Sequence, residues 1–529
     1  MTQKFDVAVL GGGPAGLSGA LALGRARRSV VVVDAGTPRE ARSGAVHGFF
    51  SRDGIDPAEL AAIGRAEAER YGAVLVRATA LAARRADDAF EVTLDDGRSI
   101  TARRLLVATG ATEELPDIAG VGERWGRDVV HCSDSQGWEL RDRPVAVIAT
   151  HRPQWAVRQA LMFRRLTSEV TFLQHTAEAV TEQQASQLAA WGIEVIGGAA
   201  VVKAVEVAED RITGVRLADG RVVPCSAVVV APRLVANAEM LAELGLTPTE
   251  NPTENPTENP TGTGTSIAAD PTGLTAVPGV WAAGGIVDLG AQVMAAAASG
   301  AAAANAINAD LIAEDTELIT RVLSGDFWEQ RYGAGQKIWS GNPNPRLVAA
   351  ATDLSPGTAL DVGSGEGADA IWLAARGWKV TGVDVAQSGL DRAARHAAEV
   401  GVDVTWQQAD ITVWDPAPTR YDLVSMQYLH FPRPLREAVC RRLAAAVRPG
   451  GTLLIVGHHP ADLEVSTLHR PRHLGHLMFT AEQAATVLDP AEWDITTAAL
   501  ERPGTDPGGQ PITLTDAVLR AVRRPVATA

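Results

Sequence analysis

The chain has 529 residues, of which 46% are apolar and 21% are charged. Its formal net charge of −15 argues against a nucleic-acid partner, because phosphate binding requires a concentrated Lys/Arg surface. The three cysteines, Cys132, Cys225 and Cys440, form no CxxC pair, so we expect no disulfide framework and a cytoplasmic location. The longest apolar stretch, 293–307, is too short for a membrane span and predicts a buried helix.

The first 34 residues predict a βαβ unit. Buried strands are expected at 5–10 and 30–33, and an Ala/Leu-rich helix that extends through Leu23 lies between them. A Gly-Gly-Gly-Pro-Ala-Gly turn at 11–16 joins the first strand to this helix. Such a turn places a dinucleotide pyrophosphate at the helix N-terminus, where free N–H groups favour anions.

Three glycines of this turn have separate predicted roles. Gly11 permits the tight turn, Gly13 lets the backbone approach the pyrophosphate, and Gly16 lets the helix pack closely on the strand. Asp34 ends the second strand about 20 residues later, where a carboxylate accepts hydrogen bonds from a ribose. Together these residues predict a dinucleotide-binding site.

Further along the chain, residues 73–101 alternate in polarity and predict antiparallel β-structure. A second α/β block is expected to begin at Val145. Three Asn-Pro-Thr steps at 251–261 predict an expanded surface loop, with a partner-docking motif as the alternative. We expect residues 314–320 to link this part of the chain to a third α/β block that begins near Leu360.

Five stretches resemble the thioredoxin reductase family of two-domain flavoproteins. They are 11–16, 47–54, 107–110, 132–138 and 277–284. The resemblance covers about residues 3–312 and implies that FAD is the bound cofactor. By this resemblance, Thr109 and Gly110 lie beside the FAD, Gly284 lies near its ribityl chain, and Gln292 lies along the isoalloxazine.

The chain departs from the family at the residues that carry electrons. The family has a redox CxxC where this chain has Cys132 and Ser135, so no disulfide is expected between these positions. The second nucleotide fingerprint is replaced by 149–156, which contains no glycine. Gln174 and His175 replace the arginine pair that reads the NADPH phosphate. We therefore expect FAD without NADPH-driven disulfide chemistry, and Cys132 is either a catalytic nucleophile or a buried relic.

Residues 360–367, Leu-Asp-Val-Gly-Ser-Gly-Glu-Gly, resemble the first motif of class I methyltransferases, which use S-adenosylmethionine (SAM). The resemblance implies that Gly363 and Gly365 let the backbone pass close under the methionine part of SAM. It also implies that Asp361 binds the amino group, directly or through water.

The next two strands are expected to complete the SAM site. Asp384 ends the second strand of this block, where it is placed to accept both ribose hydroxyls. Asp410 and Ile411 end the third strand, where an acidic side chain meets the adenine amine. A fourth strand at 421–426 follows in the order typical of the family.

Two aromatic segments precede this motif. Residues 327–332 and 339–344 resemble the N-terminal lid of small-molecule methyltransferases of the thiopurine and tellurite-resistance type. Such a lid encloses SAM, with Trp328 or Trp339 walling the site. A core-packing role is the alternative for Trp328.

Histidines provide the candidate acid–base groups. His430 follows the fourth strand and is the predicted catalytic base, and His458 follows the next strand and is predicted to line the substrate site. His469, His473 and His476 have a spacing that suggests a metal, but no carboxylate or helical pattern supports one, so no metal site is expected.

The predicted fold class is α/β, with a two-domain FAD/NAD(P)-type Rossmann-like flavoprotein module followed by a class I methyltransferase Rossmann-like domain. The predicted domains are a discontinuous FAD-binding domain (1–112 and 238–312), a degenerate NAD(P)-binding-like domain (113–237), a linker and lid (313–345) and a methyltransferase domain (346–529).

The expected function is methylation of a small molecule by a homodimer with no nucleic-acid or membrane partner. Thiol S-methylation in natural-product biosynthesis or detoxification is the leading hypothesis. The alternatives are a flavin-dependent substrate oxidase whose product is O- or N-methylated, and a flavin module that serves only as a scaffold.

Overall fold

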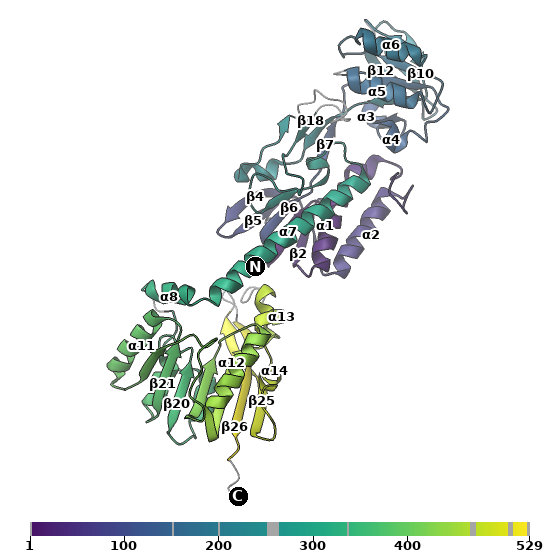
Figure 1. Cartoon of the computed structure of the whole chain (residues 1–529). Helices are drawn as coiled ribbons and strands as arrows, with labels where there is room; N and C mark the ends of the chain where they lie inside the picture. The colour runs from purple at the N-terminus through teal and green to yellow at the C-terminus, as the bar shows by residue number, and fades with distance from the viewer. Residues whose placement is uncertain are drawn as a thin grey trace. The chain divides into compact units, whose positions relative to one another are not determined.

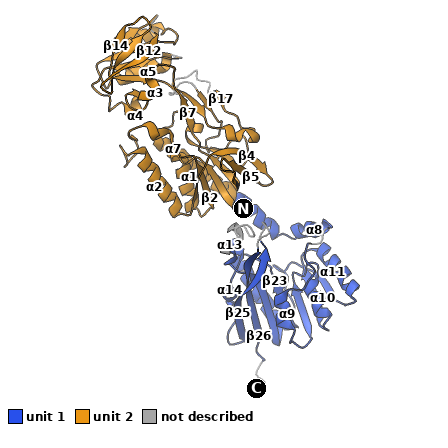
Figure 2. Ribbon diagram, turned by 180° about the vertical axis from the view of Figure 1, so that it is seen from behind, with its two compact units in different colours: residues 1, 312–529 blue, residues 2–311 orange. Residues whose placement is uncertain are grey.

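The computed structural model describes residues 3–150, 153–198, 201–250, 264–335, 338–465, 472–505 and 511–525. Clustering of contacts divides the chain into two compact units, residues 2–311 and residues 312–529 with Met1 (Figure 2). The repeat at 251–261 and His469 lie outside the described residues. The domain bounds predicted above stay a prediction within these two units.

The first unit contains a seven-stranded sheet in which the glycine turn is placed. Its parallel strands are β1 (Gln3–Leu10), β2 (Val30–Asp34), β3 (Val74–Arg77), β6 (Ser99–Val107) and β19 (Val280–Ala282). An antiparallel meander of β4 (Ala80–Ala86) and β5 (Ala89–Leu94) pairs with β6. The prediction that all of 73–101 is antiparallel is wrong for β3, because helix α2 (Pro57–Arg70) separates β2 from β3 and allows parallel pairing.

Helices α1 (Pro14–Arg25) and α7 (Val293–Val322) pack against each other and against this sheet (Figure 1). Their approach depends on small residues, since a Cβ added at Gly300 would lie 1.9 Å from the Ala15 carbonyl oxygen. The close packing fixes the start of α1, and with it the position of the glycine turn.

A second sheet lies within the same unit. Its five parallel strands have the order β11-β10-β9-β15-β8, which are respectively Glu194–Ile196, Val170–Leu173, Val145–Ile148, Ala227–Val230 and Val129–Val130. Helices α5 (Pro153–Phe163) and α6 (Glu182–Ala190) pack with it. The strand predicted at Val145 is therefore present as β9, which pairs with β10 and β15 in this parallel sheet.

Residues 314–320, predicted as a linker, are helical. They lie within α7, which extends to Val322. No glycine or proline occurs from 301 to 324, so nothing in the local sequence stops the helix that begins at Val293. The polar residues of 314–320 resemble a linker in composition but carry no helix breaker.

The second unit is a seven-stranded sheet with helices on both faces. The strand order is β22-β21-β20-β23-β24-β26-β25. The bounds are Thr405–Gln408, Lys379–Asp384, Thr358–Val362, Tyr421–Gln427, Val447–His458, Pro511–Arg523 and Trp493–Thr505 in that order. Strand β26 is antiparallel to both of its neighbours, and the other pairs are parallel.

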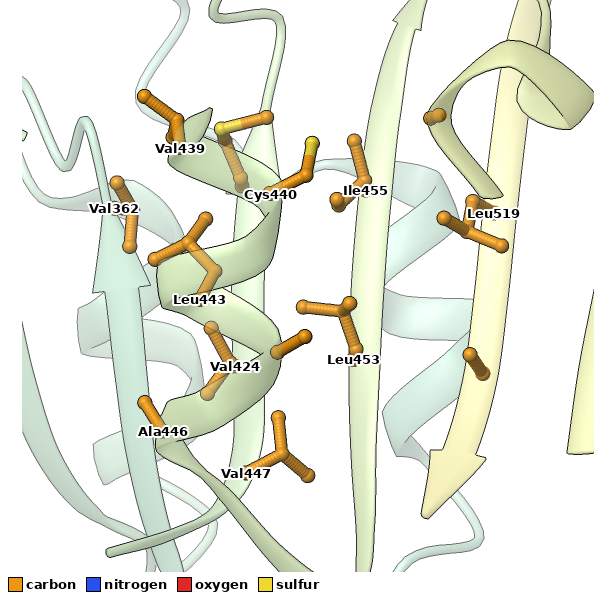
Figure 3. Packing of buried hydrophobic residues seen from close by; sticks show 14 of the residues in the cluster. Val362, Val424, Val439, Cys440, Leu443, Ala446, Val447, Leu453, Ile455 and Leu519 are labelled. Carbon is orange, nitrogen blue, oxygen red and sulfur yellow. The ribbon is translucent and has the colours of Figure 1, made fainter. Parts of the chain in front are cut away.

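Two apolar clusters hold this sheet between its helices. Helix α12 (Arg433–Ala446) packs Val439, Cys440 and Leu443 onto one face (Figure 3). Helices α9 (Pro345–Ala351) and α10 (Ala368–Ala374) cover the other face. This architecture confirms the α/β fold class predicted for both halves of the chain.

Candidate functional site

The turn between β1 and α1 has the geometry that a dinucleotide pyrophosphate requires. Gly11 has φ +106°, and its N–H donates to the Val33 carbonyl at 2.8 Å. A Cβ at Gly16 would lie 1.9 Å from the Gly11 carbonyl oxygen, whereas a Cβ at Gly13 would meet nothing within 4 Å. Gly16 is therefore needed for packing, and Gly13 leaves open space at the start of α1.

A cavity of about 340 Å³ opens beside this turn. It is lined by Gly12 and Gly13 of the turn, by α1 and α2, and by Val293 and Ala297 of α7. Asp34 lies against the turn, because a Cβ at Gly12 would meet its carboxyl group at 2.6 Å. The open space at Gly13 and the helix N-terminus fit the FAD pyrophosphate.

The other residues that the resemblance assigns to FAD follow β6, follow β19 or directly precede α7. The Thr109 hydroxyl donates to the Asn237 carbonyl at 2.6 Å, and the Asn237 amide donates back to the Thr109 carbonyl at 3.0 Å. Gly110 and Gly284 both have positive φ, +69° and +76°. The Gly284 N–H donates to the Ser299 hydroxyl at 2.9 Å, which ties this loop to α7.

Cys132 and Gln292 line one cavity of about 170 Å³ in the first unit. Cys132 precedes the short helix α4 (Ser133–Gln136) and is 8% exposed. Its Sγ lies 3.6 Å from the Ser135 Oγ, the position where the family has its second thiol. Sequence reasoning placed Cys132 and Gln292 in separate motifs, and the structure brings them together at one cavity.

His131, which the sequence did not single out, lines the same cavity. Its ring stacks on Trp155 of α5 with centroids 5.5 Å apart and an interplanar angle of 11°. Burial, and to a lesser extent the nearby Arg39 cation, lowers the pKa of His131 to about 3. The imidazole is therefore neutral at physiological pH, and a cation is not available from it to stabilise a Cys132 thiolate.

In the second unit, the turn after β20 brings the predicted SAM residues together. Asp361 is 2% exposed, and its Oδ2 has no hydrogen-bond partner among the described residues. Gly363 and Gly365 have φ +75° and +51°. The Gly365 N–H donates to Oδ2 of Asp384 at 2.9 Å, so this turn and the end of β21 meet. An unpaired buried carboxylate beside a glycine turn fits the amino group of SAM.

Burial perturbs the carboxyl groups of this site. Burial, and then repulsion from Asp369, raises the pKa of Asp361 to about 8. Burial also raises the pKa of Asp384, although backbone N–H groups, including that of Ala386, oppose the shift. Both carboxylates are therefore poised to gain from a cationic or hydrogen-bonding ligand.

Asp410 and Ile411 follow the end of β22 by two and three residues. Oδ1 of Asp410 accepts from the Thr412 N–H at 2.8 Å and from its hydroxyl at 2.7 Å. Asp410 is exposed and Ile411 is 8% exposed. Their predicted roles at adenine stay predictions.

The lid segment lies over the SAM turn through an aromatic residue that the sequence did not single out. Tyr332, at the end of helix α8 (Gly325–Gly333), is 4% exposed, and its hydroxyl accepts from Nε1 of Trp339 at 3.1 Å. A Cβ at Gly365 would lie 2.6 Å from this hydroxyl oxygen. Trp328 donates instead to the carbonyl of Val322, the last residue of α7, at 2.9 Å.

The two predicted histidines are adjacent. The rings of His430 and His458 stack with centroids 4.8 Å apart, and the ring of Tyr428 also stacks on His458, with centroids 4.5 Å apart. Nε2 of His430 accepts the backbone N–H of His458 at 3.0 Å. Nδ1 of His458 is buried and has no partner among the described residues. The predicted base, His430, thus has its Nε2 lone pair already engaged.

Two properties of the described residues bear on metals and membranes. No group of three His, Cys, Asp or Glu side chains among them is arranged to hold a metal ion. None of the described helices is both long enough and apolar enough to cross a membrane.

The chain matches two family models. The model of the pyridine nucleotide-disulphide oxidoreductases matches residues 5–301, and a methyltransferase domain model matches residues 359–451.

Individual relatives agree with this division. The solved structure of HlmI is 41% identical, with a TM-score of 0.55, over 61% of this chain and 98% of that chain. The thioredoxin reductase tcpT of Claviceps purpurea is 34% identical over 34% of this chain, and the match spans 59% of that relative's length. The ubiquinone biosynthesis O-methyltransferase of Aeromonas salmonicida is 39% identical over 21% of this chain and 49% of its own length.

These matches confirm the predicted fusion and its two cofactors, FAD and SAM. The chain belongs to the pyridine nucleotide-disulphide oxidoreductase family, with a thioredoxin reductase-like flavoprotein module followed by a SAM-dependent methyltransferase domain.

Proposed function

We propose that the chain transfers the methyl group of SAM to the sulfur of a small-molecule thiol, in natural-product biosynthesis or detoxification. One observation carries this choice of acceptor atom. Nε2 of His430, the predicted base, accepts the backbone N–H of His458 and is not free to take a proton. A thiol ionises near neutral pH without a strong base, whereas a hydroxyl or amine usually needs one.

SAM supplies an activated methyl group when it is bound, and the protein residues position it. We assign the amino group of SAM to Asp361 and the ribose hydroxyls to Asp384. The adenine is assigned to Asp410 and Ile411, and Trp339 of the lid walls the site. The enzyme gains rate mainly by holding the acceptor sulfur in line with the methyl group and by excluding water.

The test is a comparison of matched acceptors with the full chain and SAM. An aryl thiol is expected to be methylated and the corresponding phenol is not. His430→Gln is the matched variant, because the glutamine amide oxygen is also able to accept the His458 N–H. We expect this variant to retain thiol methylation. Methylation of the phenol alone, abolished in His430→Gln, would contradict S-methylation.

O-methylation is the second candidate, and His458 favours it. Its Nδ1 is buried without a partner among the described residues, so the tautomer with its proton on Nε2 offers a lone pair that no hydrogen bond engages, unlike Nε2 of His430. The similarity to an O-methyltransferase of ubiquinone biosynthesis supports the same candidate. Under this hypothesis His458→Asn abolishes phenol methylation, whereas thiol methylation falls much less.

For the flavin module, we propose that FAD is retained and reacts with a substrate without NADPH. The pyrophosphate is assigned to Gly11, Gly13 and Gly16. The ribose is assigned to Asp34, and the rest of FAD to Thr109, Gly110, Gly284 and Gln292. FAD, when bound, accepts two electrons from a reduced substrate. The single thiol, Cys132, has a serine 3.6 Å away where a second thiol would be, which supports direct reaction of the substrate over disulfide exchange within the chain.

We further propose that the chain is a homodimer in the cytoplasm and has no nucleic-acid partner. The net charge of −15 supports the last point. Sedimentation equilibrium of the purified chain tests the dimer, and a single species of monomer mass would exclude it.

A further inference from the structure

A buried carboxylate in the SAM turn has no role in the site assigned above. Glu366 lies between Gly365 and Gly367 and is only 4% exposed. A buried charge is costly unless it is paired and hydrogen-bonded. Among the described residues, the hydrogen-bond donors to the Glu366 carboxylate lie outside the SAM turn, and they identify what this carboxylate holds.

Two of the donors are backbone N–H groups of the lid, and the third is a cation on α11 (Gln387–Val400). The Ile338 N–H lies 3.3 Å from Oε1 and the Trp339 N–H lies 3.1 Å from Oε2. Nη1 of Arg392 donates to Oε1 at 2.8 Å, and its Nη2 donates to the Tyr332 carbonyl oxygen. The Arg392–Glu366 ion pair therefore holds the lid at two places, since Arg392 binds the Tyr332 carbonyl and Glu366 binds the N–H groups of 338–339.

The lid residue held in this way lies directly on the SAM turn. The hydroxyl of Tyr332 accepts from Nε1 of Trp339, and its ring lies 3.1 Å from the place of a Cβ at Gly389. Burial raises the pKa of Tyr332 to about 12, so the hydroxyl stays neutral. The same turn donates the Gly365 N–H to Asp384, the carboxylate assigned to the ribose.

The charge on Glu366 is maintained by these contacts. Burial alone would raise its pKa, but hydrogen bonds from the Trp339 N–H, the Arg392 guanidinium and the Ile338 N–H lower it below the usual value. The carboxylate is therefore ionised across the physiological range, and its hydrogen bonds are of the stronger, charge-assisted kind.

We propose that Glu366 is a positioning residue for methyl transfer, whose carboxylate latches the lid onto the turn that binds SAM. The turn follows Asp361 at the end of β20 and contacts Asp384 on the SAM side, and it bears Glu366 on the lid side. Ordering of the turn by SAM therefore favours the latched lid, and the latched lid favours bound SAM. The inference depends on SAM binding and is independent of which acceptor atom is methylated.

The experiment uses the full chain and S-adenosylhomocysteine, the demethylated product of SAM. Calorimetry measures its affinity, and hydrogen exchange measures protection of α8 and of the Trp339 amide with and without it. The variant is Glu366→Gln, which removes the charge and keeps the shape. The matched control is Glu399→Gln, an exposed glutamate at the end of α11.

In the wild type and in Glu399→Gln, we expect the ligand to slow exchange in α8 and at Trp339. In Glu366→Gln, exchange is expected to stay fast with and without the ligand, and the affinity to fall roughly tenfold, as for the loss of one charged hydrogen bond. A Glu366→Gln variant that binds and protects the lid like the wild type would overturn the proposal.

Two further outcomes are separable. If Glu366→Gln does not fold, Arg392→Lys is used instead. Lysine keeps the positive charge but lacks the second guanidinium nitrogen, which donates to the Tyr332 carbonyl oxygen. Wild-type affinity and lid protection in Arg392→Lys would then refute the latch. Failure of the wild type to bind the ligand would refute the SAM site itself. Failure of the thiol assay leaves this test unaffected.

Discussion

A single buried carboxyl group, Asp361, makes SAM binding depend on pH. Its pKa is raised from 3.8 to about 8, first by burial and then by Asp369. Between these two values the unfolded chain is ionised and the folded chain keeps the proton, so the free energy of unfolding falls as the pH rises from about 4 to about 8. The cost of the buried charge above that pH is offset by a cationic ligand.

We therefore expect the affinity for S-adenosylhomocysteine to increase as the pH rises towards 8, because only the ionised carboxylate pairs with the ligand's ammonium group. Asp361→Asn is expected to bind more weakly and to lose this pH dependence. Calorimetry in buffers of different ionisation enthalpy measures both the affinity and the proton released. A wild-type affinity that does not change with pH would refute this account.

The second prediction at the scale of residues concerns Ser135, which stands where the family has its second thiol. Because its Oγ lies 3.6 Å from the Sγ of Cys132, Ser135→Cys is expected to form the disulfide that the wild type lacks. Titration of thiols in denaturant after oxidation would then show two fewer thiols than the reduced variant has. Ser133→Cys, whose hydroxyl makes no such contact, is the control. Complete thiol titration in oxidised Ser135→Cys would show that the two positions do not face each other.

At the scale of elements, two glycines of the β1–α1 turn have different roles, one in packing and the other in ligand binding. A Cβ at Gly16 would overlap the Gly11 carbonyl, and a Cβ at Gly13 would meet no protein atom. The two glycines belong to one motif in the sequence but differ in what surrounds them.

This difference predicts opposite outcomes for two alanine variants. Gly16→Ala is expected to destabilise the fold by about 1–3 kcal/mol through overpacking and to lose FAD. Gly13→Ala is expected to keep its stability within about 0.5 kcal/mol and still lose FAD, since the methyl group enters the pyrophosphate space. Thermal unfolding and the flavin-to-protein absorbance ratio distinguish the two effects. Full flavin content in Gly13→Ala would place the pyrophosphate elsewhere.

The sequence predicted these turns because their signals are local. A strand, a glycine motif and a helix are contiguous, so the positions of Gly11 and Asp361 followed from the chain itself. The pairing of Glu366 with 338–339 spans about 28 residues and left no periodic signal. The helical conformation of 314–320 was not predicted, because this segment was identified only as the connection between the two modules, although the absence of glycine and proline from 301 to 324 favours a helix.

At the scale of the whole molecule, the two units have separate hydrophobic cores. All hydrogen bonds described around the SAM turn come from residues 312–529. A chain that begins at Ile312 is therefore expected to fold and to bind S-adenosylhomocysteine with the affinity of the full chain. Calorimetry on the shortened chain checks this, and a loss of binding would show that the flavoprotein module completes the SAM site.

The cofactors of the whole molecule were predicted correctly because each depends on a contiguous motif. The prediction that NADPH does not reduce the flavin depends instead on three departures from the family at separate places in the sequence. They are the missing second thiol, the absence of glycine from 149–156, and Gln174 and His175 in place of the arginine pair.

The most direct test of the account is an anaerobic absorbance titration of the purified flavoprotein with NADPH, then NADH, then a simple dithiol. The account predicts that both nucleotides leave the flavin oxidised and that the dithiol bleaches its visible band. Bleaching by NADPH would contradict the account and establish a nucleotide-driven reductase. A flavin that stays oxidised with all three would also contradict it, and would leave methyl transfer as the reaction of the chain.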